Sequence, residues 1–288
     1  MAENGYISKG GRLAARLSRP ESRVIMVVGG ADTGKTAFVG ELSGLLSDGA
    51  IVGVLDLDMG QSHIGPPTTI AWGKVEGGFK GWDAIKAEDI YFTGALSPPG
   101  NLLPAIVGAK KVLDLAMPKC EKLVIDTTGL IAGPLGRVFK HYKIELLDPD
   151  IIIGLERASE LEHILGPLKF DKRTVIRLKT HKSVSYKTPA ARAGYREEAF
   201  RRYFLDARQI EVGLDRVGVR HTRADEGGSL TGRIVSLRSG DRDLALGFAV
   251  KRPMKEKNLV IRTPLERGEK FTTVLIGEAA VPQGILDA

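Results

Sequence analysis

The chain has 288 residues, of which 43% are hydrophobic and 27% charged, so it can bury the core of one large domain or two. Its single cysteine, Cys120, excludes an internal disulfide framework and a multi-cysteine metal site. No apolar run approaches the roughly 20 residues of a membrane helix, and the first 23 residues lack the apolar core of a signal peptide. We therefore expect a cytoplasmic protein with no membrane association.

The formal net charge of +7 is concentrated in one segment. Residues 169–208 contain twelve Lys and Arg against four Asp and Glu, so this segment carries the whole basic excess. Such segregation of charge indicates a polyanionic partner, nucleic acid first. The alternative is a solvated helix face with no partner.

Short β-branched runs alternate with helical patterns through the first two thirds of the chain. The predicted strands are residues 24–28, 51–58, 89–94, 122–129, 150–156 and 174–179. Helices are predicted to begin near Thr36, Asn101, Pro134, Ser159 and Thr188. Apolar strands separated by helices are typical of an α/β fold, in which a mainly parallel sheet is covered by helices on both faces.

From about residue 209 the pattern changes to short strands broken by Gly-rich turns, which predicts a small C-terminal all-β domain. The predicted organisation is thus an N-terminal extension (1–23), an α/β domain (24–208) whose last helix spans about 188–207, and a β domain (209–288).

The segment VVGGADTGKTAF has the spacing of a phosphate-binding loop between a predicted strand and a predicted helix, as a P-loop NTPase requires. Backbone amides of such a loop and the helix N-terminus surround phosphate oxygens. Lys35 is expected to reach the β and γ phosphates, and Thr36 to ligate magnesium. The predicted nucleotide-binding residues are Gly29, Gly30, Ala31, Asp32, Thr33, Gly34, Lys35, Thr36 and Ala37.

Two acids at predicted strand ends, Asp58 and Asp126, are candidates for the metal or the general base. Either could instead cap the turn that follows its strand, and the residues alone do not rank them.

A second cationic feature lies in KTPAARAGYREEAFRRYF. Thr188 and Pro189 have the pattern of a helix start, so Arg192 and Arg196 project from one helix face. Paired guanidinium groups suit the oxygens of a transferring phosphoryl group. The alternative is a surface pair matched to the acids at 197 and 198.

Six blocks in order resemble the polynucleotide 5′-hydroxyl kinases, a family that includes the RNA kinase subunit of the pre-mRNA cleavage machinery and the nucleolar kinase of rRNA processing. The blocks are GGADTGKT (29–36), LDLDMGQ (55–61), GALSPPGN (94–101), DTTGLIAGPLG (126–136), LERASEL (155–161) and RAGYREEAFRRYF (192–204). The fourth is similar to the family's substrate clasp and the last to its lid.

The resemblance implies a catalytic set made of Lys35, the general base Asp58 and the lid arginines Arg192 and Arg196. The residues expected at magnesium are Thr36 and Asp58.

Three features depart from the family pattern. Leu130 replaces a tryptophan that is typical of eukaryotic relatives, and Asp126 stands where relatives often have asparagine. Those relatives also have an N-terminal β domain that helps to hold the adenine, whereas about 23 residues precede the first strand here.

Substrate contacts are therefore expected from the clasp and from the segment after Asp58. The expected residues are Gln61, His63, Trp72, Thr127, Thr128 and Gly129. Rings in this region could stack on a base. For His63 the alternative is a satisfied loop histidine, and for Trp72 it is core packing.

The resemblance implies an ATP- and magnesium-dependent kinase that phosphorylates the 5′-OH ends of RNA or DNA in processing or repair. Two alternatives are a nucleotide-switched GTPase or ATPase without a polynucleotide acceptor, and a silent scaffold that binds ATP and RNA.

Overall fold

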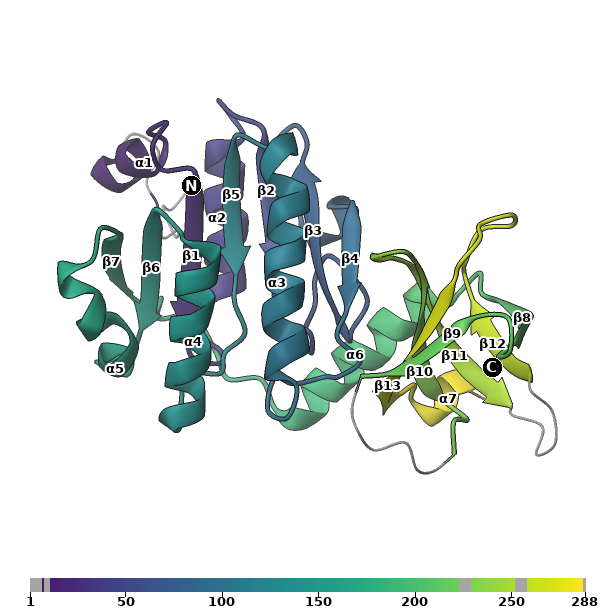
Figure 1. Ribbon diagram of the computed structural model, residues 1–288. Coiled ribbons are helices and arrows are strands. Elements are labelled where there is room, and N and C mark those ends of the chain that lie inside the picture. Colours follow the sequence, from purple (N-terminus) through teal and green to yellow (C-terminus); the bar gives the residue numbers. More distant parts are fainter. Residues whose placement is uncertain (1–6, 8–10, 223–228, 252–257, 287–288) are drawn as a thin grey trace.

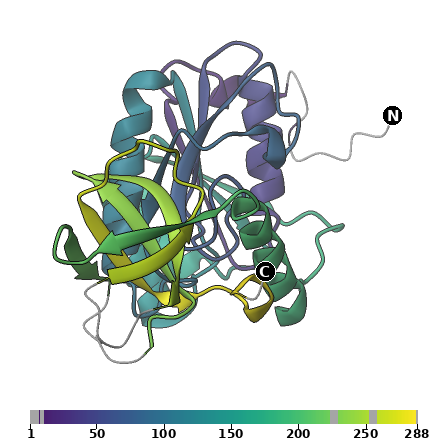
Figure 2. The ribbon, with the colours of Figure 1, turned by 90° about the vertical axis from the view of Figure 1, so that its right-hand side faces the viewer.

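The computed structural model describes residues 7, 11–222, 229–251 and 258–286. Two sheets form two parts of the molecule, a larger α/β part and a smaller β part, joined through helix α6 (Pro189–Tyr203) (Figures 1 and 2). Within the described ranges, no helix combines the length and the apolar content that crossing a membrane requires.

The first sheet has seven strands. In spatial order they are β4 (Asp89–Phe92), β3 (Thr69–Val75), β2 (Val52–Asp56), β5 (Lys122–Asp126), β1 (Val24–Gly29), β6 (Ile151–Glu156) and β7 (Thr174–Lys179). The strands from β2 to β7 in this order pair in parallel, whereas β3 is antiparallel to both of its neighbours. The mainly parallel sheet is confirmed, but β3 is a strand that the sequence analysis did not predict.

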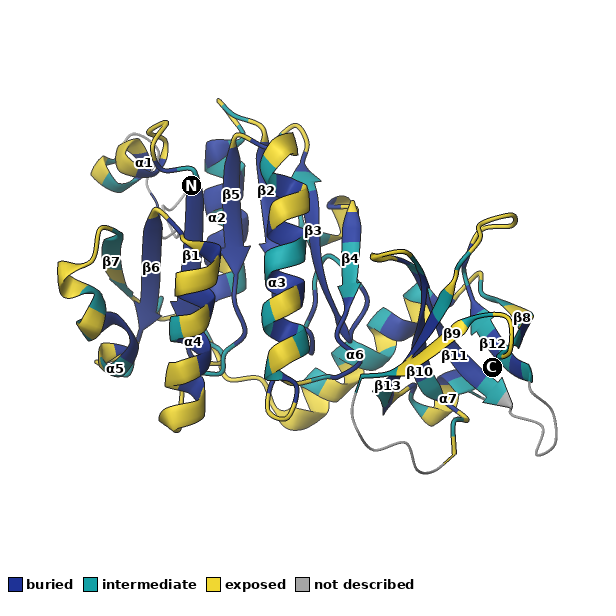
Figure 3. Ribbon diagram, viewed as in Figure 1, coloured by how far each residue is buried: buried dark blue, intermediate teal, exposed yellow. Residues whose placement is uncertain are grey.

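Helices cover both faces of this sheet, as predicted. On one face lie α3 (Leu102–Ala116) and α4 (Gly133–Leu147), and on the other lies α2 (Lys35–Leu46) (Figures 1 and 2). Alternate residues of β1 point to opposite faces: Met26 joins the core under α3 and α4, and Val27 the core under α2. Figure 3 shows the inner strands of the sheet buried between the two helical layers.

Shorter helices complete the first part. They are α1 (Arg12–Leu17), α5 (Glu162–Leu165) and the 3₁₀ turns η1 (Trp82–Ala84), η2 (Met117–Lys119) and η3 (Gly166–Phe170). The helix expected from Ser159 is only the four residues of α5, and α6 ends at Tyr203 rather than near residue 207.

The second sheet confirms the small all-β domain. Its strands, in spatial order, are β8 (Arg208–Gly213), β12 (Asn258–Thr263), β11 (Arg242–Lys251), β10 (Arg233–Ser239), β13 (Thr273–Ala280) and β9 (Gly218–His221). Neighbours are antiparallel except β13 and β9. A last helix, α7 (Gln283–Leu286), follows.

One core cluster joins the two parts. Phe92 of β4, Phe200 and Phe204 at the end of α6, and Phe248 of β11 are all buried in it. The rings of Phe204 and Phe248 meet edge to face with centroids 5.0 Å apart. The C-terminal end of α6 is therefore anchored in the β domain, while its N-terminal end reaches the first sheet.

Candidate functional site

The phosphate loop lies between strand β1 and helix α2, as the sequence predicted. Asp32 and Gly34 have positive φ angles of 53° and 83°, which turn the chain into the helix. A Cβ atom on Gly29 would lie 2.7 Å from the carbonyl oxygen of Leu155, so only glycine fits beside β6. Lys35 is buried, its Nζ donates to the carbonyl oxygen of Gly30 at 2.6 Å, and burial lowers its pKa.

Asp126 at the end of β5 contacts the first turn of α2. The hydroxyl of Thr36 donates to Asp126 Oδ2 at 2.6 Å. Burial raises the pKa of this carboxyl group, and its Oδ1 has no hydrogen-bond partner among the described residues. The contact exists because β1 and β5 are adjacent parallel strands whose carboxyl ends meet at one edge of the sheet.

Asp56 and Asp58 have different surroundings, although both belong to the block LDLDMGQ. Asp56 is buried and accepts hydrogen bonds from the hydroxyl of Ser62 and from the backbone N–H groups of His63 and Ile64. Burial raises the pKa of Asp56 to about 6. Asp56 thus fixes the turn that follows β2, a role that the sequence analysis missed.

Asp58 faces a cavity of about 480 Å³. Its Oδ1 accepts hydrogen bonds from the backbone N–H groups of Gly60 and Gln61, each at 3.1 Å. The cavity wall combines the loop from Ala31 to Ala37 with most of the other expected site residues: Asp58, Gln61, His63, Thr127, Thr128, Gly129, Arg192 and Arg196. Gly29 and Gly30 belong to the loop but do not line the cavity.

Trp72 does not reach this cavity, and its prediction as a substrate contact is wrong. Its side chain is fully buried in β3, where it packs in the core under α3. The indole Nε1 donates to Asp89 Oδ2 at 3.1 Å. No strand was predicted here, but the segment forms one between β2 and β4, so the alternative of core packing is confirmed and the ring is unavailable to a base.

The start of α6 agrees with the sequence analysis. The side chain of Thr188 accepts a hydrogen bond from the N–H of Ala191 at 3.1 Å, as an N-cap does. Arg192 Nη2 pairs with Asp32 Oδ2 of the loop at 2.5 Å, and Gln61 Nε2 donates to the carbonyl oxygen of Arg192 at 3.2 Å. This helix end therefore lies against the loop and against the turn after β2.

The acids at 197 and 198 do not neutralise Arg192 or Arg196. Glu197 and Glu198 pair instead with Arg201, at 3.0 and 2.7 Å. Arg196 lines the cavity and has no ion pair within the described part of the chain. The alternative interpretation of the two arginines as a surface ion-pair network is therefore wrong.

The clasp segment after β5 is held by a lysine that the sequence analysis missed. Lys140 of α4 is fully buried, and its Nζ donates to Thr127 Oγ1 at 2.9 Å and to the carbonyl oxygen of Thr128 at 2.5 Å. A Cβ atom on Gly129 would lie 2.7 Å from the backbone nitrogen of Ala31, so glycine allows the clasp to touch the loop. The signal in the sequence that could have identified Lys140 is that a lysine stands among the apolar residues on the buried face of α4.

His63 lines the cavity and contacts two aromatic rings. Its centroid is 5.3 Å from that of Trp82 and 5.3 Å from that of Tyr195 of α6. The hydroxyl of Tyr195 donates to the carbonyl oxygen of Ser62 at 2.9 Å. His63 thus helps to dock α6 as well as to line the cavity.

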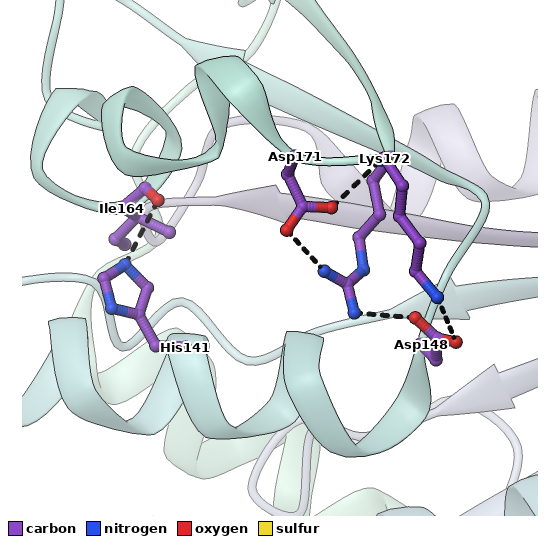
Figure 4. Close-up of polar contacts among 6 residues, drawn as sticks. His141, Asp148, Ile164, Asp171 and Lys172 are labelled. Atoms are coloured by element: carbon purple, nitrogen blue, oxygen red, sulfur yellow. Dashed lines mark hydrogen bonds and ion pairs between the residues drawn. The ribbon is translucent and has the colours of Figure 1, made fainter.

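Part of the basic segment is engaged away from the cavity. Lys172 Nζ pairs with Asp148 Oδ2 at 2.9 Å, at the end of α4 (Figure 4). Arg173 bridges Asp148 and Asp171 at 2.6 and 2.8 Å. These pairs tie the connection between β6 and β7 to α4, so their charges are already compensated.

A mainly parallel sheet, a phosphate loop after its inner strand β1, and strand-end carboxylates beside that loop define a P-loop nucleotide-binding protein. Comparison with known proteins gives the particular family. The chain belongs to the family described as mRNA cleavage and polyadenylation factor CLP1 P-loop, whose model matches residues 29–206.

Several relatives are named polyribonucleotide 5′-hydroxyl-kinase. Those of Methanocaldococcus jannaschii and Pyrococcus abyssi are 35% and 36% identical over 204 residues, which cover 70% of this chain and 56% of each relative. That of Thermococcus kodakarensis is 31% identical over 248 residues, 84% of this chain and 68% of the relative. The chain thus spans little more than half the length of the first two relatives.

A solved structure of the wild-type Clp1p–Pcf11p complex has the same fold. It superposes with a TM-score of 0.73 and 14% sequence identity, and the match covers 93% of this chain and 78% of the other.

Proposed function

We propose that this protein is an ATP-dependent polynucleotide 5′-hydroxyl kinase that transfers the γ-phosphoryl group of ATP to the 5′-OH end of RNA or DNA. One observation carries the proposal: a single cavity joins the phosphate loop, the carboxylate of Asp58 and the two arginines of α6. The names of the similar proteins support a polyribonucleotide acceptor.

Asp58 is the proposed general base. The 5′-hydroxyl oxygen forms a bond to the γ-phosphorus, the bond from that phosphorus to the bridging oxygen of ADP breaks, and the hydroxyl proton passes to Asp58. The N–H groups of Gly60 and Gln61 hold Oδ1 in place and leave Oδ2 for this proton. Because the transition state of phosphoryl transfer is loose, the proton can leave late and an ordinary carboxylate suffices.

Charge neutralisation is assigned to Lys35, Arg192 and Arg196. All three line the cavity, and guanidinium groups match the oxygens of a phosphoryl group in two-point contacts. The ion pair between Arg192 and Asp32 holds α6 beside the loop.

The donor set beside the loop fits magnesium. Thr36 and Asp126 offer only oxygen atoms, and Asp126 Oδ1 is buried without a hydrogen-bond partner among the residues described. We therefore assign Asp126, in place of Asp58, to the metal together with Thr36. When bound, magnesium would neutralise charge on the β and γ phosphate oxygens.

The function is tested by following labelled γ-phosphate from ATP, with magnesium, to RNA and DNA oligonucleotides that end in a 5′-OH. Identical strands that already carry a 5′-phosphate serve as the acceptor control. We expect label only on the 5′-OH strands, and none with Lys35→Ala. Asp58→Asn should lower transfer by at least about 100-fold and leave ATP binding intact, because it removes only the proton acceptor.

Asp114→Asn is the matched control, since this acid lies on the surface of α3 in a pair with Lys110. Release of free phosphate without a labelled strand would replace the kinase by a nucleotide switch. Binding of ATP and RNA with neither product would favour the scaffold.

A further inference from the structure

Arg157 and Tyr186 form a pair beside the phosphate loop that the proposed mechanism does not use. Arg157 directly follows β6, and its Nη2 donates to the carbonyl oxygen of Asp32 in the loop. Its guanidinium carbon lies 4.4 Å from the ring centroid of Tyr186, which belongs to the connection between β7 and α6. Both side chains are exposed, Tyr186 to 72%.

The order of the strands places this pair on the opposite side of β1 from Asp58. Asp58 follows β2, on one side of β1, whereas Arg157 follows β6, on the other side. A triphosphate held by the loop with its γ end toward Asp58 therefore has its ribose and base on the β6 side. The neighbours of Tyr186 in the chain, Ser185 and Lys187, line the cavity, so the pair borders it.

We propose that Arg157 and Tyr186 are the stacking site for the nucleobase of the donor nucleotide. This inference rests on the proposed function only in taking the loop as a nucleotide site. A guanidinium plane backed by an aromatic ring presents its other face to a base, and both cation–π and base stacking are favourable at such a surface.

The site holds a base without reading its edge. The carboxylate of Glu160, on the turn after β6, uses its two oxygens to accept the backbone N–H groups of Arg157 and Ala158, at 2.7 and 2.8 Å. Stacking tolerates any base because every base has a π face. ATP and GTP should consequently bind with affinities within a few-fold of each other.

The test compares two probes by calorimetry in magnesium buffer: ATP, and inorganic tripolyphosphate, which has the phosphates but no base. Tyr186→Ala should weaken ATP binding about tenfold relative to the parent chain and leave tripolyphosphate binding unchanged. Arg157→Ala should weaken ATP binding more than tripolyphosphate binding, since its guanidinium also donates to the loop. Tyr186→Phe should bind ATP like the parent, because it keeps the ring. Tyr142→Ala, which removes an exposed ring from α4, is the matched control.

Equal losses for the two probes would overturn the proposal, because they would place the effect in the loop. Unchanged ATP binding in both alanine variants would overturn it as well. Neither binding measurement needs an acceptor strand. If the protein does not label 5′-OH ends but its variants lose ATP binding alone, the proposed kinase activity is wrong and the proposed base site stands.

Discussion

Lys140 and Lys143 lie three residues apart on α4, both fully buried, but their amines have different partners. Lys140 donates to Thr127 and Thr128 of the clasp. Lys143 has no hydrogen-bond partner among the described residues, and its Nζ lies 4.5 Å from the ring centroid of Phe139. Burial lowers the pKa of both amines, that of Lys143 to about 7.

Lys143→Met should stabilise the protein at neutral pH. A lysine of the unfolded chain titrates near pH 10.4, so between about pH 7 and 10 the unfolded chain binds a proton that the folded chain has released. The free energy of unfolding therefore rises with pH in this range because of Lys143. The methionine variant should be more stable than the parent by a few kcal/mol at pH 7, with the difference gone near pH 10. Urea unfolding at several pH values measures this.

Lys140→Met is the matched comparison. It also removes the burial penalty of an amine, since burial lowers the pKa of Lys140 as well, but it should stabilise the protein less than Lys143→Met. It leaves the buried carbonyl oxygen of Thr128 without its donor, which costs about 1–3 kcal/mol, and it loosens the clasp beside the loop. A Lys143→Met variant that is less stable than the parent at pH 7 would contradict the assignment of an uncompensated amine.

At the scale of elements, α6 is held at both ends. Arg192 and Tyr195 bind the loop and the turn after β2, and Phe200 and Phe204 are buried against the β domain. The arginines of its first turns are thereby carried to the cavity on a helix whose far end is fixed.

Replacing these arginines by lysine tests the geometry rather than the charge. Arg192→Lys and Arg196→Lys should each lower kcat for phosphoryl transfer at least about 100-fold, because an ammonium cannot make the planar two-point contact. Arg201→Lys is the control on the same helix, where the arginine pairs with surface acids and transfer should stay near the parent rate. Equal losses in all three variants would assign the effect to the helix rather than to the site.

The elements that could be predicted from the sequence are those whose signal is local. The loop from Gly29 to Thr36 and the start of α6 are specified by neighbours in the chain, and both agree with the structure. The contact of Thr36 with Asp126 depends instead on which strands are adjacent, so spacing could not rank Asp126 against Asp58. The strand around Trp72 was missed for the same reason, because its burial comes from β2, β4 and α3 together.

At the scale of the molecule, a buried charge cluster joins the sheets. Asp243 of β11 accepts the backbone N–H of Phe92 of β4 at 2.8 Å, and it pairs with Arg238 at 2.7 Å. Its side chain is fully buried and that of Arg238 is 8% exposed. The two parts are thus joined by backbone and charge as well as by the phenylalanine cluster.

Asp243→Asn should lower the free energy of unfolding by about 3–5 kcal/mol, because Arg238 is left buried without its anion. Since the cluster spans both sheets, urea unfolding should remain one transition at a lower midpoint. Asp241→Asn is the matched control: this acid is 81% exposed and pairs with Lys111 on the surface, so the midpoint should stay close to that of the parent. A separate early transition in the Asp243 variant would mean that the two parts unfold independently.

The cations of the basic segment fall into two groups, those that form an ion pair with an acid and those that do not. Lys172, Arg173 and Arg177 pair with acids, as do Arg201 and Arg202 on α6. Four cations between the end of β7 and the middle of α6 have no ion pair among the described residues. They are Lys179, Lys182, Lys187 and Arg196. The last two line the cavity, so this row leads to the cavity wall.

Binding of a single-stranded polynucleotide should therefore depend on salt through about four phosphate contacts. The logarithm of the association constant should fall with the logarithm of salt concentration with a slope of about −3, since single strands give about −0.7 for each contact. Lys182→Gln should make the slope shallower by about 0.7. Lys172→Gln should leave it unchanged, because that charge is already paired with Asp148. Fluorescence anisotropy of a labelled RNA at several salt concentrations measures the slopes, and equal changes in the two variants would show that the strand follows a different path across the molecule.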